Sequence, residues 1–334
     1  MANSIPFNID WKQARPASEV AAVNAALMQP GVVEMTLARL HRVTVGLPDA
    51  DGLHVRYLAT GGAKRVYLIQ VTLRGAVAYC FVAKYFLPIQ LAHLPPGTTV
   101  GGASHDAADL EARLLARAVW AAQRVDDLAP GLCPRFGGFW QWIDAQGRSV
   151  RIMTEAYVAG DSLERWKGVL ENRFTQGALD FSQYTAQRLS MERQAIGAYI
   201  RLWDVLGRCT FTSDPSPWNV LFTPIPGGYR PTLIDLHSIH DGGTPLYVFQ
   251  TLEELFGNRD EIRLQALCPG ILDALGVADG VQMLKTVRGE LKAQADARER
   301  TGLSPFTASI GAISNFLASR SGHTVDVPTD PTRP

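Results

Sequence analysis

One segment of the chain sets two carboxylates and an amide at fixed spacing around short apolar stretches. Asp214 precedes Asn219 by five residues, and Asp235 follows Asn219 by sixteen. The apolar residues after Asn219 and before Asp235 predict a short hairpin with these two residues at its ends. Phosphoryl transfer needs such a set, because one carboxylate orients the attacking hydroxyl while an amide and a second carboxylate hold Mg²⁺. The spacing favours that chemistry, although two loops joined by a hairpin could also produce it by chance.

A glycine pair and a lysine lie upstream, in an order that suits nucleotide binding. Gly61 and Gly62 separate two β-prone stretches and predict a turn whose backbone can approach phosphate oxygens closely. An ordinary hairpin would carry the same pair. The next β-prone run, residues 77–86, holds Lys84 near its end. A lysine there is either an edge charge or a paired residue that reaches phosphate, and the preceding glycine turn favours the second.

A helix is predicted over residues 105–122, since apolar residues recur there at helical spacing. Ser104 or Asp106 can cap it. Glu111 is the predicted partner of Lys84, and the alternative for Glu111 is a solvated surface charge. Residues 88–104 form a long segment between the strand of Lys84 and this helix. The identity of the acid that pairs with Lys84 therefore stays open.

These elements together resemble the protein-kinase-like superfamily, over residues 55 to 257. The Asp-x4-Asn…Asp spacing is similar to its catalytic and metal loops, and Val-Ala-Lys is similar to its Val-Ala-Ile-Lys strand. Met-Thr-Glu-Ala-Tyr, residues 153–157, is similar to the hinge of aminoglycoside- and choline-type phosphotransferases. Ile-Asp-Leu-His, residues 234–237, resembles a short sequence motif of the lipopolysaccharide-core sugar kinases that contains their metal-binding aspartate. The resemblance implies an α+β, bilobal protein-kinase-like fold, with a small antiparallel-sheet N-lobe and a larger, mostly helical C-lobe.

The resemblance also implies a role for each residue of the segment and for the lysine. Asp214 would be the catalytic residue that orients and deprotonates the acceptor hydroxyl. Asn219 and Asp235 would hold Mg²⁺. Lys84 would bind the α- and β-phosphates of ATP, and Glu111 would position Lys84.

The remaining nucleotide contacts follow from the same resemblance. Gly61 and Gly62 would cover the phosphates, and the backbone of Glu155 and Tyr157 would meet adenine. The cofactors implied are therefore ATP and Mg²⁺.

The acceptor is expected to be a small molecule with a hydroxyl group. Pro245 follows Asp235 by only ten residues, which leaves little room for the activation segment of a protein-substrate kinase. A sugar or a secondary metabolite such as an aminoglycoside-like compound would fit. Thr212 stands where the family usually has a histidine, so a pseudokinase or a nucleotide-binding interaction module is the main alternative. A protein kinase, or transfer of AMP at the same site, is a further alternative.

The chain is expected to divide into four parts. Helices are predicted within the first 50 residues, over 17–27 and 32–43, and toward the C-terminus over 245–256, 260–274, 279–299 and 306–319. The parts are an N-terminal helical extension over 1–50, an N-lobe over 51–157, a helical C-lobe over 158–320 and a disordered tail over 321–334.

Composition agrees with a cytoplasmic enzyme that has no nucleic-acid partner and no membrane span. The formal net charge is zero and the isoelectric point is about 7.1, so no polyanion-binding surface is indicated. The first residues lack the basic start and apolar core of a secretory signal. Cys80, Cys133, Cys209 and Cys268 are far apart in the sequence and are predicted to be reduced core thiols.

Overall fold

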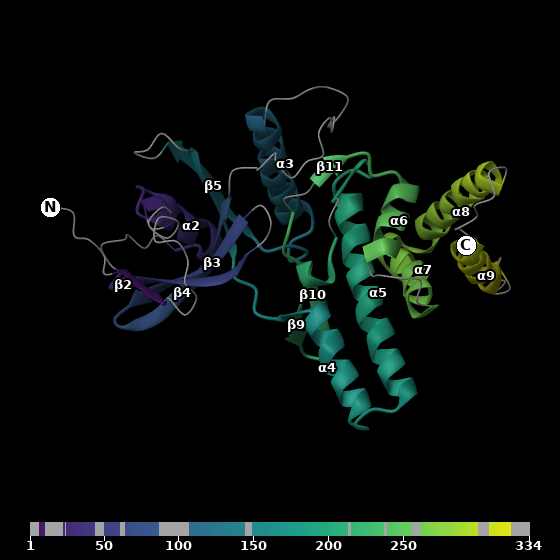
Figure 1. Ribbon diagram of the computed structural model, residues 1–334. Coiled ribbons are helices and arrows are strands. Elements are labelled where there is room, and N and C mark those ends of the chain that lie inside the picture. Colours follow the sequence, from purple (N-terminus) through teal and green to yellow (C-terminus); the bar gives the residue numbers. More distant parts are fainter. Residues whose placement is uncertain are drawn as a thin grey trace, which may run out of the picture. The chain divides into compact units, whose positions relative to one another are not determined.

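The computed structural model consists of two compact units. The residues it describes are 7–10, 23, 25–43, 50–60, 64–86, 107–143, 149–212, 215–236, 239–255, 261–299 and 307–321. One unit comprises Met1–Gly160 and Ile234–Ile239, and the other comprises Asp161–Leu233 and His240–Pro334. A mainly antiparallel sheet dominates the first unit and helices dominate the second (Figure 1), which confirms the predicted α+β fold class. The predicted tail over 321–334 lies almost entirely outside the described residues.

Six strands form the sheet of the first unit, in the order β1-β2-β3-β4-β6-β5. All neighbouring strands are antiparallel except β1 and β2, which are parallel. Between β3 and β4, Arg74 and Gly75 have φ angles of 52° and 74°, as a two-residue type I′ turn requires. The strands are β1 (Phe7–Asp10), β2 (Gly52–Thr60), β3 (Lys64–Leu73), β4 (Ala76–Phe86), β5 (Phe136–Ile143) and β6 (Ser149–Ala156).

Helix α2 (Val32–His41) covers one face of this sheet. Its buried side chains Val33 and Leu37 belong to the same apolar cluster as Ile69 and Phe81 of the strands. Each such fully buried side chain contributes about 1.5–3 kcal/mol to folding. The N-terminal helical extension therefore contributes α2 to the core of the first unit. Most of the helix predicted over 17–27 lies outside the described residues.

Helix α3 (Ala107–Leu128) also belongs to the first unit and packs near β5. It begins close to the predicted start and runs about two turns further than predicted. Its expected caps, Ser104 and Asp106, lie outside the described residues, as does the side chain of Glu111.

The second unit is built from six helices within the described residues. Helices α4 and α5 form an antiparallel pair (Figure 1), and a capping box at Asp180 and Gln183 begins α5. The last four helices begin and end within two residues of the predicted ranges. The helices are α4 (Leu163–Thr175), α5 (Phe181–Val205), α6 (Pro245–Leu255), α7 (Glu261–Leu275), α8 (Val277–Glu299) and α9 (Thr307–Ser321).

Helices α5 and α7 approach each other closely at a glycine. A Cβ on Gly270 would lie 2.8 Å from Ile196 Cγ2 and 2.9 Å from Arg193 O. Only glycine fits at this contact. The close approach holds α5, which leads into the predicted catalytic loop, firmly against the rest of the unit.

Most of the remaining short strands belong to the second unit. One small sheet has the order β10-β9-β7, and β8 pairs with β11. The strands are β7 (Asp161–Ser162), β8 (Thr210–Thr212), β9 (Val220–Ile225), β10 (Gly228–Leu233) and β11 (Ile239–Asp241). Strands β9 and β10 form the hairpin predicted between Asn219 and Asp235.

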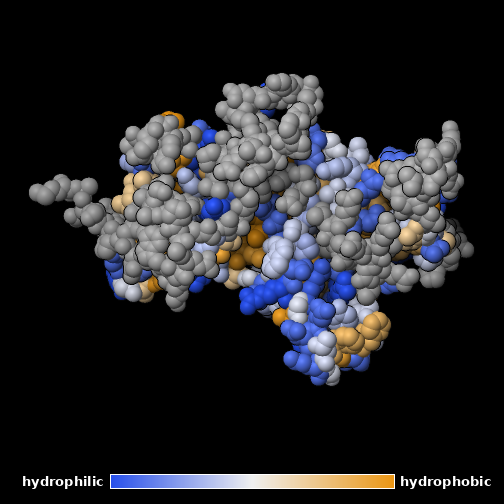
Figure 2. Space-filling view, in the orientation of Figure 1, coloured by the Kyte–Doolittle hydropathy of each residue, from blue (hydrophilic) through white to orange (hydrophobic). Residues whose placement is uncertain are grey.

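An apolar patch lies at the turn between α4 and α5. Phe174 stacks on Tyr184 with ring centroids 5.0 Å apart, and Phe181 is 66% exposed. Figure 2 shows apolar surface in this region of the second unit.

The cysteines are free thiols, but they do not all lie in the core as predicted. Burial raises the pKa of Cys133, and burial also raises the pKa of Cys268 to about 12. Cys209 is exposed instead, because it follows the tight turn of Gly207 and Arg208 that ends α5. Within the described segments, no helix has both the length and the apolar character that crossing a bilayer requires.

Candidate functional site

Two lysines and a glutamate lie on the sheet face opposite α2. Lys84 of β4 is paired with Val66 of β3 and with Met153 of β6. Residues opposite each other in a sheet point to the same face, and so do alternate residues of one strand. Lys64 lies two residues before Val66, and Glu155 lies two residues after Met153. Both therefore share the face of Lys84.

The Lys84 side chain makes two contacts on this face. Its Nζ lies 2.5 Å from Glu155 Oε2 and donates a hydrogen bond to Ile234 O at 2.6 Å. The side chains of Lys84 and Glu155 are each 5% exposed. This is a diagonal cross-strand pair, which long side chains can bridge. A buried pair of this kind needs both partners, because either charge alone would be costly to bury.

Lys64 contacts the predicted metal ligand. Its ammonium group forms an ion pair with Asp235 Oδ1, and the two side chains are 6% and 14% exposed. Burial and the nearby Lys84 lower the pKa of Lys64 to about 8, while Asp235 opposes that shift. Lys64 thus remains mainly protonated at neutral pH. The four side chains of Lys64, Lys84, Glu155 and Asp235 are called the lysine cluster below.

Glu155, which is predicted to meet adenine through its backbone, lies within strand β6. It pairs with Val82 of β4 and with Phe136 of β5, so its backbone lies inside the sheet and its side chain belongs to the lysine cluster. Backbone groups inside a sheet are used by neighbouring strands. Tyr157 follows the end of β6 and is 40% exposed. Of the two residues predicted to meet adenine, Tyr157 is the one that lies outside the strand.

Three of the predicted nucleotide residues are not described. Gly61 and Gly62 lie between β2 and β3, outside the described residues, and so does the Glu111 side chain. The predicted pair between Lys84 and Glu111 stays a prediction. Glu155 is the acid that contacts Lys84 in the structure.

The predicted catalytic loop lies between β8 and β9 in the second unit. Thr212, which stands where the resembled family usually has a histidine, is buried at the end of β8. Asp214 lies outside the described residues, so its role stays a prediction. Asn219 ends a single 3₁₀ turn, η3 (Pro217–Asn219), and directly precedes β9.

This turn is held by hydrogen bonds from α5. The Tyr199 hydroxyl accepts a hydrogen bond from Ser216 N at 3.0 Å and donates one to Ser216 O at 3.2 Å. Ser216 Oγ accepts from Trp218 N at 3.3 Å, and Asn219 N donates to Ser216 O at 2.9 Å. The backbone before Asn219 is therefore well fixed.

Asn219 and Asp235 flank the β9–β10 hairpin in sequence. Its register pairs Val220 with Leu233, so the chain enters and leaves the hairpin at the same end. Asn219 comes one residue before Val220, and Asp235 comes two residues after Leu233. Carboxylate and amide oxygens are ligands that Mg²⁺ accepts. No group of three or more His, Cys, Asp or Glu side chains suited to a metal ion occurs among the described residues.

The sequence alone did not identify Lys64. It follows the glycine turn directly, and only its pairing position shows that it shares the face of Lys84. The one signal in the sequence that could have identified Lys64 is its place in the β-prone stretch directly after the Gly61–Gly62 turn.

Comparisons with known proteins give distant structural likenesses. The chain matches no protein-family model, and it matches no curated protein. Among solved structures it is similar to WaaP in complex with acyl carrier protein, with 14% sequence identity and a TM-score of 0.35. The alignment covers 81% of this chain and 88% of that chain. At this level the likeness carries no argument about substrate or activity.

Proposed function

We propose that this protein is an ATP- and Mg²⁺-dependent phosphotransferase that transfers the γ-phosphate to a hydroxyl group of a small molecule. The lysine cluster carries the proposal. Burying an ammonium group is costly, and a fold that needed only one ion pair would not bury two lysines on one sheet face. Two ammonium groups beside two carboxylates, one of which is Asp235, suit a polyphosphate and its metal ion.

Each residue of the cluster has a role in this proposal. Lys84 and Lys64 would bind phosphate oxygens, and Glu155 would hold Lys84 in place. Asp235 would be a metal ligand together with Asn219, because both offer oxygen donors that suit Mg²⁺. The bound metal ion would neutralise charge on the phosphates. Asp214 would orient the acceptor hydroxyl.

The length of chain after Asp235 supports a small acceptor. Helix α6 begins at Pro245, ten residues after Asp235. A protein-kinase activation segment would need more chain than this. A sugar or a secondary metabolite therefore fits the proposal better than a protein substrate.

The first prediction tests nucleotide binding at Lys84. Lys84→Met keeps the aliphatic stem but removes the charge, so it is expected to lose most of the ATP-dependent rise in melting temperature. Phosphotransfer should fall by about 10²–10³, as for the loss of one preorganised donor at a transition state. The measurements are thermal-shift titrations with ATP, with and without Mg²⁺, and rates on any acceptor found in a screen of sugars, aminoglycosides and nucleosides.

Stability effects are separated by two further variants. Lys84→Met leaves the Glu155 carboxylate buried without its partner, so its own melting temperature should fall. Lys84→Met/Glu155→Gln should recover much of that loss without recovering the ATP response. Lys285→Met, at an exposed lysine on α8, is the control and should behave like wild type. If wild type gives no response to ATP and Mg²⁺, the enzyme proposal is wrong.

The mass of any product distinguishes phosphate transfer from AMP transfer.

A further inference from the structure

Lys64 holds the carboxylate that is proposed to bind Mg²⁺. Its ammonium group donates a hydrogen bond to Asp235 Oδ1 and forms an ion pair with it, and the two side chains are only 6% and 14% exposed. A metal ion at Asp235 would bind through the oxygens of the same carboxylate. The Lys64 ammonium group is therefore a counter-ion of the kind that a bound metal ion would replace.

A separate contact fixes the backbone next to Asp235. Lys84 Nζ donates a hydrogen bond to Ile234 O at 2.6 Å, and its ion pair is with Glu155. Lys84 thus holds the main chain just before Asp235, whereas Lys64 holds the Asp235 side chain. Lys64 is the first residue of β3, and its long, flexible stem lets the ammonium group change partners. Lys64 can therefore leave Asp235 without releasing the chain at Ile234.

The charges of the lysine cluster are balanced. Two ammonium groups face two carboxylates. A free metal ion that bound Asp235 would add two positive charges and would separate Lys64 from its partner. A buried ammonium group without a partner is costly. Nucleotide phosphates remove this cost, because they offer Lys64 new anionic acceptors in place of Asp235.

We propose that Lys64 is a positioning residue that pairs with Asp235 before the metal ion binds and transfers to a nucleotide phosphate when Mg²⁺ binds Asp235. This rests on the proposed function and adds to it the order of binding. Free Mg²⁺ binds weakly, and the metal ion binds tightly only together with the nucleotide. The opposing explanation is a permanent ion pair that supports the fold and never opens to a metal ion.

The first measurement is binding of Mn²⁺ to the full chain without nucleotide. Mn²⁺ accepts the same oxygen ligands as Mg²⁺, and the unbound ion can be counted by electron paramagnetic resonance. Lys64→Met keeps the aliphatic stem and removes the charge. We expect it to bind Mn²⁺ at least about tenfold more tightly than wild type, since coupling between two sites is usually about 5–150-fold. A substitution that merely loosened the fold would not raise the affinity for a metal ion.

Two variants serve as controls for this gain. Lys84→Met removes an equally buried charge from the same sheet face, but the ion pair of Lys84 is with Glu155. Its gain in Mn²⁺ affinity should stay below about threefold, because a charge acts less strongly at longer range. Lys64→Met/Asp235→Asn also removes the carboxylate and should lose the gain. No gain in Lys64→Met, an equal gain in Lys84→Met, or a gain that persists in the double variant would overturn the exchange.

The second measurement tests the transfer of Lys64 to phosphate. Calorimetry gives the affinity of wild type and Lys64→Met for a non-hydrolysable ATP analogue in excess Mg²⁺. We expect this affinity to stay within about threefold of wild type or to fall, because the variant gains at Asp235 but loses the contact between Lys64 and phosphate. A gain as large as that for Mn²⁺ alone would overturn the transfer. Absence of any response to Mg²⁺ and the analogue in wild type would instead reject the phosphotransferase proposal, whereas the failures of the exchange leave that response intact.

Discussion

Asp235→Asn is expected to abolish Mg²⁺-dependent nucleotide binding, whereas Asp214→Asn is expected to keep it and lose turnover. Asp235 is proposed as a metal ligand, and an amide binds Mg²⁺ more weakly than a carboxylate. Asparagine can still accept a hydrogen bond from Lys64, so the fold should be preserved. Asp214 is proposed only to orient and deprotonate the acceptor. A positioned base contributes about 10²–10⁴ in rate, roughly 3–5 kcal/mol of barrier.

The two variants are compared by calorimetric titration with Mg²⁺ and ATP and by steady-state rates on the same preparations. Asp241→Asn changes an exposed acid six residues after Asp235 and should leave both properties close to wild type. Equal nucleotide affinity in Asp235→Asn and wild type would remove Asp235 from the metal site. Full turnover in Asp214→Asn would mean that the base is another residue.

The sequence predicted the elements of the fold well because their patterns are local. Lys84 was found as the single lysine near the end of an apolar β-prone run, and β4 indeed contains it. The hairpin after Asn219 and the last four helices follow from apolar spacing within each segment. These features need no knowledge of how distant parts of the chain meet.

Lys64 could not be predicted because its face depends on a β-bulge. Counting back from the Arg74–Gly75 turn without interruption would place Arg65 opposite Lys84, which would send Lys64 to the α2 face. The register shifts by one residue between Val71 and Thr72, so Val66 is opposite Lys84 instead. A shift of one residue exchanges the two faces of a strand. The pattern of the sequence gives no sign of that shift.

The contact between Glu155 and Lys84 could not be predicted for a related reason. The resemblance directs attention to the backbone of the segment after β6, whereas the side chain of Glu155 is what contacts Lys84. Glu155 lies 71 residues beyond Lys84 in the sequence, and their contact depends on β6 pairing with β4 rather than on any local pattern.

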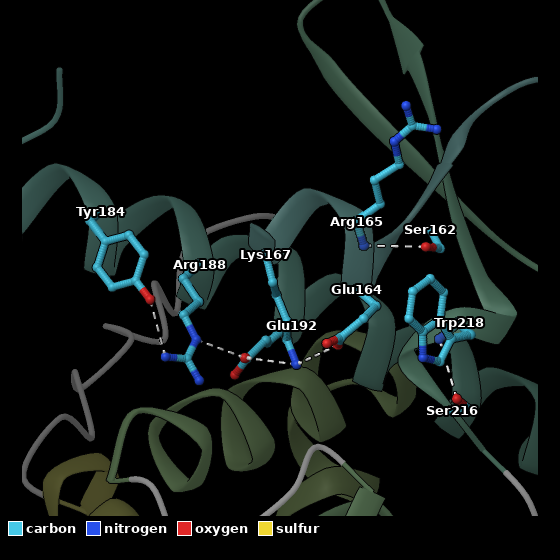
Figure 3. Close-up of polar contacts among 9 residues, drawn as sticks. All are labelled: Ser162, Glu164, Arg165, Lys167, Tyr184, Arg188, Glu192, Ser216 and Trp218. Atoms are coloured by element: carbon cyan, nitrogen blue, oxygen red, sulfur yellow. Dashed lines mark hydrogen bonds and ion pairs between the residues drawn. The ribbon is translucent and has the colours of Figure 1, made fainter. Parts of the chain in front are cut away.

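A second buried charge cluster connects α4 and α5 in the second unit. The Glu192 side chain is fully buried, and its Oε1 accepts a hydrogen bond from Arg188 Nε at 3.1 Å. Lys167 Nζ of α4 lies 4.0 Å from the same oxygen, and Arg188 Nη1 donates to the Tyr184 hydroxyl at 3.4 Å (Figure 3).

Arg188→Met is therefore expected to destabilise the protein by about 3–5 kcal/mol, because it leaves the Glu192 carboxylate buried without its main partner. Lys167 compensates only in part, at its longer distance. Arg193→Met is the matched control on the same helix: Arg193 pairs with Asp273, but both side chains are about half exposed, so the cost should be below about 1 kcal/mol. The free energy of unfolding is measured by urea titration followed by circular dichroism.

The double variant Arg188→Met/Glu192→Met distinguishes a stranded charge from lost packing. If the cost comes from the uncompensated carboxylate, replacing both partners by apolar side chains should recover most of the lost stability, as it does for many buried ion pairs. If the double variant is as unstable as Arg188→Met alone, the packing of the arginine stem is responsible instead. An equal loss in Arg188→Met and Arg193→Met would contradict the buried-charge explanation, because burial is the property in which the two ion pairs differ most.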